Sequence, residues 1–260
     1  MKKSFLVASL LIAGVVFADT TTVDTDYVLG VLPVSTTGRD QVILSIPWVA
    51  EGTGGNIAVS NLVKTAGLPT GTVEDKKLTT KLTWYNTSAG EYETWILEDG
   101  QWKEASEMDP ATKALPQGNA VVLSTDGDLP DTVYVVGQVG TSATTTTEIQ
   151  VGSNGKWFLL APPCASTSEV DFNTAASVGD DWSACVGDEI VVDAFNGLLK
   201  TYKCVDRGES ANPRYVWTTS KYAATHTAMI PAGRGFWYHR SASNTGAVTI
   251  TWSGVPSSAN

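Results

Sequence analysis

Short apolar runs separated by turn-forming residues recur along the chain, and most of them are too short to be helices. The run 91–97 alternates strictly, placing Tyr92 and Ile96 on one side of an extended chain and Trp95 and Leu97 on the other. Turn signals every 8–12 residues are typical of an all-β sandwich or barrel. Strands are expected over residues 27–34, 42–46, 78–86, 91–97, 120–123 and 132–136, and again over 157–160, 189–192, 200–204 and 247–252.

Two stretches favour short helices instead. Asn56 is placed to cap a helix that runs to Val63 or Ala66, where Gly67 and a nearby proline would end it. The stretch 169–178 occupies the matching position later in the chain. One short helix is therefore expected in each half.

One turn motif occurs twice, as Leu115-Pro116-Gln117-Gly118 and as Ile230-Pro231-Ala232-Gly233, with the prolines 115 residues apart. Proline fixes φ and glycine permits positive φ, so each copy predicts a tight reversal before an apolar strand. Trp102 and Trp217 keep the same spacing of 115, whereas Trp95 and Tyr202 are 107 apart. The difference of 8 places an insertion at 207–214 in the second copy.

The repeated spacing predicts a tandem duplication. The expected fold is all-β, with two tandem, duplicated β-sandwich or barrel-like domains. We expect a signal peptide over 1–18, a first β domain over 19–139, a Thr-rich linker over 140–148 and a second β domain over 149–260.

The amino terminus has the pattern of a secretory signal peptide. Lys2 and Lys3 precede an apolar run over 5–16, and Val16-Phe17-Ala18 fits a cleavage site before Asp19. The alternative is an uncleaved membrane anchor, which the shortness of the run disfavours. The mature chain is therefore expected to be secreted, at the cell surface or in the extracellular space, with the periplasm as a further location.

The charge of the chain argues against several classes of partner. The net charge is −10, and removal of Lys2 and Lys3 with the signal peptide leaves 15 basic and 27 acidic residues, or −12. Because no basic patch is present, nucleic acid and anionic lipid are not expected as partners. No later stretch is long and apolar enough to insert in a membrane after signal cleavage. A hydrophobic share of 42% with 9 Trp is ample for a packed core.

The shared plan consists of a strand ending in proline, a short helix, strand hairpins, a Pro-x-Gly turn and a closing strand. It resembles secreted, signal-bearing bacterial proteins built from tandem β-rich repeats, a group with no assigned function. The resemblance spans residues 27–255 and rests on turn motifs. It implies an exported β-rich chain, and it offers no catalytic residue to carry over.

All three cysteines, Cys164, Cys185 and Cys204, lie in the second half. Export permits a disulfide, and Cys185–Cys204 is the candidate pair. The alternative is that they are buried thiols, because Cys164 and Cys204 align with the apolar Val49 and Leu97 of the first half. A zinc site is disfavoured, since no paired Cys or His spacing occurs.

Catalytic and metal-binding patterns are weak. The two histidines, His226 and His239, lack an evident nucleophile and orienting partner, so surface roles are favoured. A phosphate-binding loop and a dinucleotide fingerprint are absent, and no cofactor is expected. A calcium loop is a candidate at Asp126, Asp128 and Asp131, against an ordinary Asp-rich turn.

Aromatic residues concentrate on the predicted hairpins. Large rings dominate cores, and the duplicated Trp102 and Trp217 favour that role. Flat exposed rings can instead stack on sugars. The candidates for that alternative are Trp84, Trp95, Tyr92, Tyr202 and Trp237.

These patterns favour a secreted, non-enzymatic structural or interaction protein, a self-assembling subunit of a cell-surface layer or extracellular filament. Self-association is expected through sheet edges, with the opening strand 27–34 and the Thr-rich stretch as candidates. A carbohydrate-binding module, with a polysaccharide as partner, is the alternative. A glycoside hydrolase using acidic pairs such as Glu91 and Glu93, Asp180 and Asp181, or Asp188 and Glu189 is more distant.

Overall fold

The computed structural model describes residues 27–46, 56–71, 79–86, 89–106, 110–140, 144–151, 156–163, 168–193, 198–220 and 227–256. Strands account for most of this chain, and the α-helices within the described residues are two single turns. The all-β prediction is confirmed. The predicted signal peptide, Cys164 and His226 lie outside the described residues.

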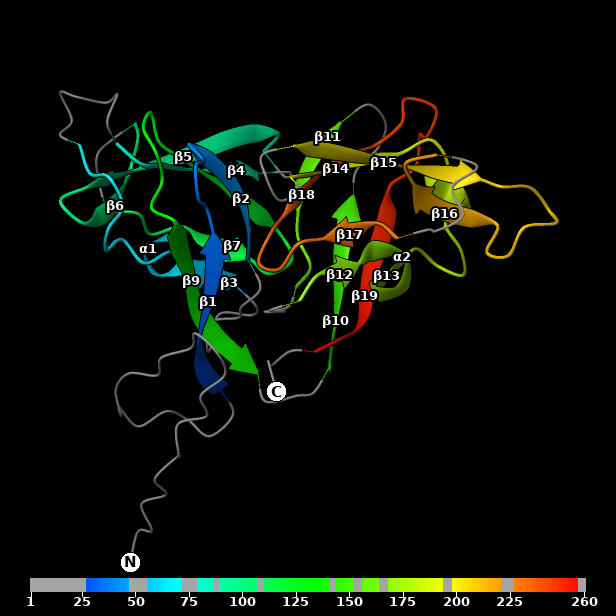
Figure 1. Ribbon diagram of the computed structural model, residues 1–260, viewed down its shortest axis with the longest axis horizontal. Coiled ribbons are helices and arrows are strands. Elements are labelled where there is room, and N and C mark those ends of the chain that lie inside the picture. The colour runs from blue at the N-terminus through cyan, green and yellow to red at the C-terminus, as the bar shows by residue number, and fades with distance from the viewer. Residues whose placement is uncertain are drawn as a thin grey trace, which may run out of the picture.

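The first half, β1 to β9, builds an antiparallel five-stranded sheet that faces a layer of two smaller sheets (Figure 1). The large sheet has the order β2-β8-β4-β5-β6. Its strands are β2 (Gln41–Ser45), β8 (Ala120–Ser124), β4 (Lys81–Asn86), β5 (Glu91–Glu98) and β6 (Gln101–Glu104). The smaller sheets pair β1 (Tyr27–Ser35) with β9 (Thr132–Gly140) and β3 (Asn56–Ala58) with β7 (Ala114–Pro116).

The second half, β10 to β19, repeats this order of pairing. Its five-stranded sheet has the order β11-β18-β14-β15-β16. These strands are β11 (Trp157–Leu160), β18 (Phe236–His239), β14 (Glu189–Asp193), β15 (Leu199–Asp206) and β16 (Tyr215–Thr218). The smaller sheets join β10 (Thr144–Val151), β19 (Val248–Pro256) and β13 (Ala176–Ser177), and β12 (Val170–Asp171) with β17 (Met229–Ile230).

Equivalent hydrogen bonds link equivalent residues in the two halves. The Leu97 amide donates to the Thr80 carbonyl, and the Cys204 amide donates to the Asp188 carbonyl. Leu97 and Cys204 are 107 apart, which is the spacing expected from the sequence. The predicted insertion lies in the hairpin of β15 and β16, because Leu97 pairs with Trp102 five positions later whereas Cys204 pairs with Trp217 thirteen positions later. The extra residues include the β15–β16 connection at 207–214.

Both predicted helices are shorter than expected. α1 covers Val59–Leu62, and its N-cap residue is Ala58. Asn56 therefore does not cap this helix and belongs to β3 instead. α2 covers Phe172–Ala175, where the Asp171 carboxylate accepts a hydrogen bond from the Asn173 amide. Strand pairing with β7 and β17 takes up the residues before each helix, so tertiary pairing overrides the local helical preference.

The Thr-rich segment predicted as a linker over 140–148 is also different. Gly140 is the last residue of β9, and Thr144–Val151 is strand β10, which pairs with β19. Threonine is β-branched and suited to strands, so a partner strand is enough to order such a run.

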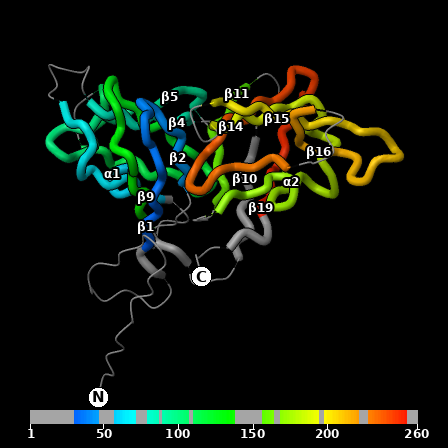
Figure 2. Tube along the Cα trace, viewed as in Figure 1, coloured from blue at the N-terminus to red at the C-terminus, as the bar shows by residue number. Residues whose placement is uncertain are grey.

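Each half has its own core between its layers, and the two bodies lie side by side (Figure 2). Trp102 and Trp217 are both buried, which confirms that this pair belongs to the core. The second core is rich in rings that pack around Phe172, three of them edge to face and Trp182 tilted by 31°. Its neighbours are Trp182, Trp217, Phe236 and Trp252, at 5.2–5.4 Å between ring centroids.

The duplicated Pro-x-Gly turns join the two halves. The Ser45 amide at the end of β2 donates to the Gly233 carbonyl at 3.0 Å, and the Ala161 amide after β11 donates to the Gly118 carbonyl at 2.9 Å. Each turn therefore covers the edge strand of the opposite half. Single β-bridges, Leu44 with Arg234 and Leu160 with Asn119, extend the same exchange.

A third apolar cluster fills the junction. It consists of Ile43, Ala120, Leu159 and Ala161. Gly235 lies against it so closely that a Cβ there would stand 2.4 Å from the Ala120 Cβ and 2.9 Å from the Leu160 carbonyl oxygen. The junction is packed as tightly as a core, which explains why both β2 and β11 read as uninterrupted apolar runs.

Candidate functional site

Apart from the Ser35 carbonyl, which accepts a hydrogen bond from Arg234, the outer edge of β1 is the main unpaired strand edge of the first half. Among the described residues, β1 pairs with β9 alone, over all nine of its positions. Pro33 has no amide hydrogen and sits within the strand, so its nitrogen faces away from β9. Tyr27, Leu29 and Val31 share its parity, and their N–H and C=O groups consequently face outward as well.

β10 has the matching position in the second half. It is an edge strand in the sheet order β10-β19-β13, and among the described residues it pairs with β19. Figure 1 shows β1 with β9, and β10 with β19, extending beyond the two bodies. Within the part of the chain that the structure describes, these are two equivalent strand edges with a partner on one side.

The edge strands of the two five-stranded sheets are covered. The Pro-x-Gly turns cover β2 and β11, as described above. On β16, the Asn173 side chain accepts from the Trp217 amide at 2.8 Å and donates to the Trp217 carbonyl at 3.0 Å. On β6, the Ala111 amide donates to the Trp102 carbonyl at 2.9 Å. Blunting of this kind is how proteins avoid unwanted pairing, which sets the open edges of β1 and β10 apart.

The predicted carbohydrate-binding residues divide into two groups. Trp84, Trp95 and Tyr202 are buried in the two cores, so their proposed role on the surface is wrong. Tyr92 and Trp237 lie on the outward face of the five-stranded sheets, Tyr92 with 58% of its surface exposed. Burial follows from alternation, because Tyr92 and Trp237 have the opposite parity to Trp95 and Tyr238.

Three further rings lie on this face: Tyr85 and Trp157, which the sequence did not single out, and His239, which was expected only as a surface residue. Trp157 opens a continuous apolar run, Trp157-Phe158-Leu159-Leu160, which hides the alternation. Pairing with β18 resolves it, because Phe158 and Leu160 enter the core while Trp157 keeps 43% of its surface exposed.

The calcium candidates Asp126, Asp128 and Asp131 are exposed. Asp126 forms a 3.7 Å ion pair with Lys81. Within the described part of the chain, no three Asp, Glu, His or Cys side chains cluster in a metal-binding arrangement.

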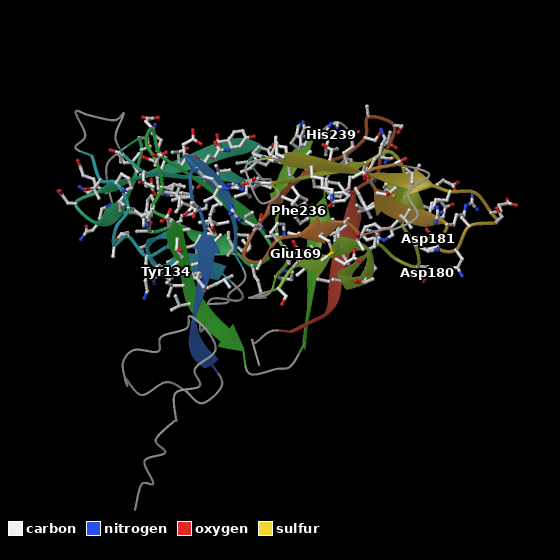
Figure 3. The ribbon with its side chains drawn as sticks, viewed as in Figure 1. Tyr134, Glu169, Asp180, Asp181, Phe236 and His239 are labelled. Carbon is white, nitrogen blue, oxygen red and sulfur yellow. The ribbon has the colours of Figure 1, made fainter. Side chains whose placement is uncertain are left out.

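The acidic pairs are held in different ways. Asp180 and Asp181 lie in an exposed turn (Figure 3), and a hydrogen bond from Ser183 lowers the pKa of Asp181. Glu93 accepts hydrogen bonds from Asn86 at 2.7 Å and Lys113 at 3.0 Å. These carboxylates are thus engaged in turns and strand pairs.

Asp188 is the most buried charged group, with none of its surface exposed. Its carboxylate accepts from the Tyr238 hydroxyl at 2.5 Å, the Ser241 amide at 2.7 Å and the Asn244 side chain at 2.6 Å, and pairs with Arg240. In the first half, the buried Thr80 stands in the equivalent position. A carboxylate with four donors at this depth is a structural anchor for the loop after β18.

Cys185 and Cys204 are free, buried thiols in the structure, so the predicted disulfide between them is not formed there. The Cys204 thiol donates to the Trp182 carbonyl at 3.5 Å. Burial raises the pKa of Cys185 to about 11 and also raises the pKa of Cys204. Both side chains act as small apolar groups, in line with the alternative expectation.

An ion cluster fastens the two halves beside the junction. Asp193 at the end of β14 contacts Arg39 of the β1–β2 turn and lies 3.6 Å from Arg234. Arg234 also donates to the Ser35 carbonyl. Burial lowers the pKa of Arg234 to about 10, with repulsion from Arg39 adding to it and Asp193 opposing it.

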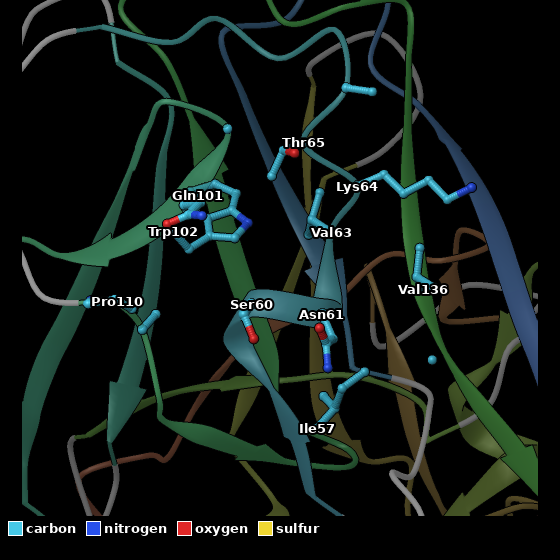
Figure 4. Close-up of a pocket in the computed structure, with 14 residues that line it drawn as sticks. Ile57, Ser60, Asn61, Val63, Lys64, Thr65, Gln101, Trp102, Pro110 and Val136 are labelled. Carbon is cyan, nitrogen blue, oxygen red and sulfur yellow. The ribbon is translucent and has the colours of Figure 1, made fainter.

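An open hollow of about 960 Å³ lies beside Trp102 in the first half (Figure 4). Ser60, Asn61 and Lys64 line one side of it, and Pro110 and Val136 line others. In the second half, Trp182 packs edge to face on Trp217, the counterpart of Trp102, with ring centroids 5.5 Å apart.

No helix within the described residues is long and apolar enough to cross a membrane. Comparison with protein-family models, curated proteins and solved structures finds no match to this chain.

Proposed function

We propose that this chain is an exported, non-enzymatic structural protein that self-associates through the edges of β1 and β10, as a subunit of a cell-surface layer or extracellular filament. The observation that carries the proposal is the outer edge of β1, a nine-residue strand paired on one side. Exposed edges of this length are templates for a further strand. The signal-like amino terminus supports export.

The number of edges determines the form of the assembly. Each chain carries two equivalent edges, one from each half, so pairing of β1 with β10 of the next copy leaves a free edge at both ends. Head-to-tail contacts that do not close into a ring grow into filaments. Pairing of β1 with β1 alone would instead stop at a dimer.

The proposal is tested by blocking the edge without disturbing the sheet. Because the Val31 amide faces away from β9, Val31→Pro removes an outward donor and leaves the β1–β9 bonds in place. We expect Val31→Pro to reduce assembly at least about tenfold, as measured by light scattering after size exclusion and by negative-stain microscopy.

The control is Val31→Thr, which keeps the amide and the β-branched shape. It should assemble like the parent chain, and both variants should keep the parent far-ultraviolet circular dichroism. A parent chain that stays monomeric at high concentration, or equal assembly of both variants, contradicts the proposal.

A further inference from the structure

Five rings form a row on the outward face of the two large sheets. This aromatic row consists of Tyr92 on β5, Tyr85 on β4, Trp237 and His239 on β18, and Trp157 on β11. Their strand neighbours of opposite parity, such as Trp84 and Tyr238, point into the cores. Figure 3 shows His239 on the side where both large sheets lie and Phe236 deeper in the molecule.

The rings are already held in place by one another. Tyr85 and Tyr92 form a cross-strand pair with centroids 5.0 Å apart. Trp157 stacks on His239 at 4.4 Å and 22° between planes, and meets Trp237 edge to face at 6.4 Å. Rings fixed in this way lose little conformational freedom when a ligand binds.

The rings of the two halves meet at the junction. Tyr85 from the first half and Trp237 from the second pack on the same small cluster of Ile43, Ala120, Leu159 and Ala161. β11 also lies against β4 and β8. The row therefore crosses from one half to the other, and neither half contains the whole of it.

Hydrogen-bonding groups flank the rings. The hydroxyls of Thr83 and Thr94 face each other at 3.2 Å beside the tyrosines. Beside the other end, Glu189 is the cross-strand neighbour of both His239 and Lys203, and forms a 3.2 Å ion pair with Lys203. Flat apolar rings with a polar margin suit a ligand that has apolar faces and hydroxyl edges.

The negative charge of the chain further restricts the class of ligand. With a net charge of −10, the molecule repels polyanions. We propose that the aromatic row binds a neutral polysaccharide of β-linked pyranose units, whose ring faces present C–H groups and whose edges present hydroxyls. An extended chain of this kind lies along consecutive rings on a sheet face and spans both halves.

This proposal does not depend on assembly through β1, and the test separates the two. The Val31→Pro chain and the parent chain are titrated with cellohexaose by calorimetry, and are mixed with insoluble cellulose to measure the bound fraction. Both chains should bind equally, because β1 lies in the opposite layer. Loss of binding by Val31→Pro alone would tie retention on cellulose to assembly and would overturn the aromatic row as the site.

Variants within the row give the direct test. We expect Trp157→Ala and Tyr92→Ala each to weaken cellohexaose binding at least about tenfold, since aromatic anchors carry most of such affinity. Trp157→Tyr should restore most of it. The matched control is Tyr134→Ala, because Tyr134 is 39% exposed on β9 in the other layer (Figure 3).

Two results would overturn the proposal. One is absence of binding by the parent chain to cellohexaose and to the neutral xylan and mannan chains run beside it. The other is an equal loss in Tyr134→Ala and Trp157→Ala, or tighter binding to anionic polygalacturonate than to the neutral chains.

Discussion

The second core contains a buried carboxylate and buried thiols at positions where the first core has other side chains. Asp188 is held by four donors, whereas Thr80 takes its place in the first half. Cys185 and Cys204 lie close to this carboxylate, and its charge helps to raise the pKa of both thiols, after burial. The thiols therefore belong to a buried polar anchor and are not exposed reactive groups.

The thiol pKa values predict low reactivity and a pH-dependent stability. At about pH 8, Cys185 and Cys204 should resist iodoacetamide in the native chain and react in urea, as peptide mass spectrometry will show. Above about pH 8.5 the unfolded chain loses these protons first, so the free energy of unfolding should fall as the pH rises toward 11. Rapid native alkylation, or stability that rises over this range, would contradict the assignment.

At the scale of elements, the Pro-x-Gly turns do more than reverse the chain. Each turn feeds the strand next to it and also bonds the edge strand of the other half, through Gly118 and Gly233. Gly235 allows the approach, since its α-carbon faces Ala120, Ile43 and the Leu160 carbonyl with no room for a methyl group. The repeated motif therefore connects the two halves.

Gly235→Ala should destabilise the chain by about 1–3 kcal/mol, because the added methyl group overpacks the junction. The measurement is the urea midpoint followed by tryptophan fluorescence. Gly246→Ala is the matched control, because nothing lies within 4 Å of a Cβ at that position, and it should change stability by less than about 0.5 kcal/mol. Equal effects of the two substitutions would argue against tight packing at Gly235.

At the scale of the whole molecule, the two halves are one packed body. Backbone bonds, the Ile43–Ala120–Leu159–Ala161 cluster and the Asp193 ion cluster all cross the junction. The aromatic row exists because of this arrangement. Its tyrosines and its tryptophans come from different halves, and only docking puts them in one row.

Asp193→Ala should lower the free energy of unfolding by about 3–5 kcal/mol, because it removes the buried carboxylate that Arg39 and Arg234 share. Scanning calorimetry should show a lower midpoint and separation of the unfolding of the two halves. Arg214→Ala removes the 2.9 Å pair with Asp206, in which the Arg214 side chain is 41% exposed, and should lower the midpoint far less, because exposed ion pairs contribute little to stability. A single, unshifted transition in Asp193→Ala would show that the ion cluster does not couple the halves.

Local chemistry in the sequence determined the strands, the hairpin at Asp99-Gly100, the burial of Trp102 and Trp217, and the insertion at 207–214. The strands and the hairpin depend on alternation and turn preference, which act over a few residues. The burial of the two tryptophans and the insertion followed from the repeated spacing of 115 residues. The sequence also predicted the opening strand as a candidate edge.

Tertiary structure decided what the apolar runs face. Parity alone does not say which side of a strand is the core, so the alternative that placed Trp84, Trp95 and Tyr202 on the surface stayed open, and Trp157 was missed. The Thr-rich segment became β10 because β19 was there to pair with it. Which edges stay open, and which rings share a face, depend on contacts between elements that are distant in the sequence, such as Ser45 with Gly233 and Ala161 with Gly118.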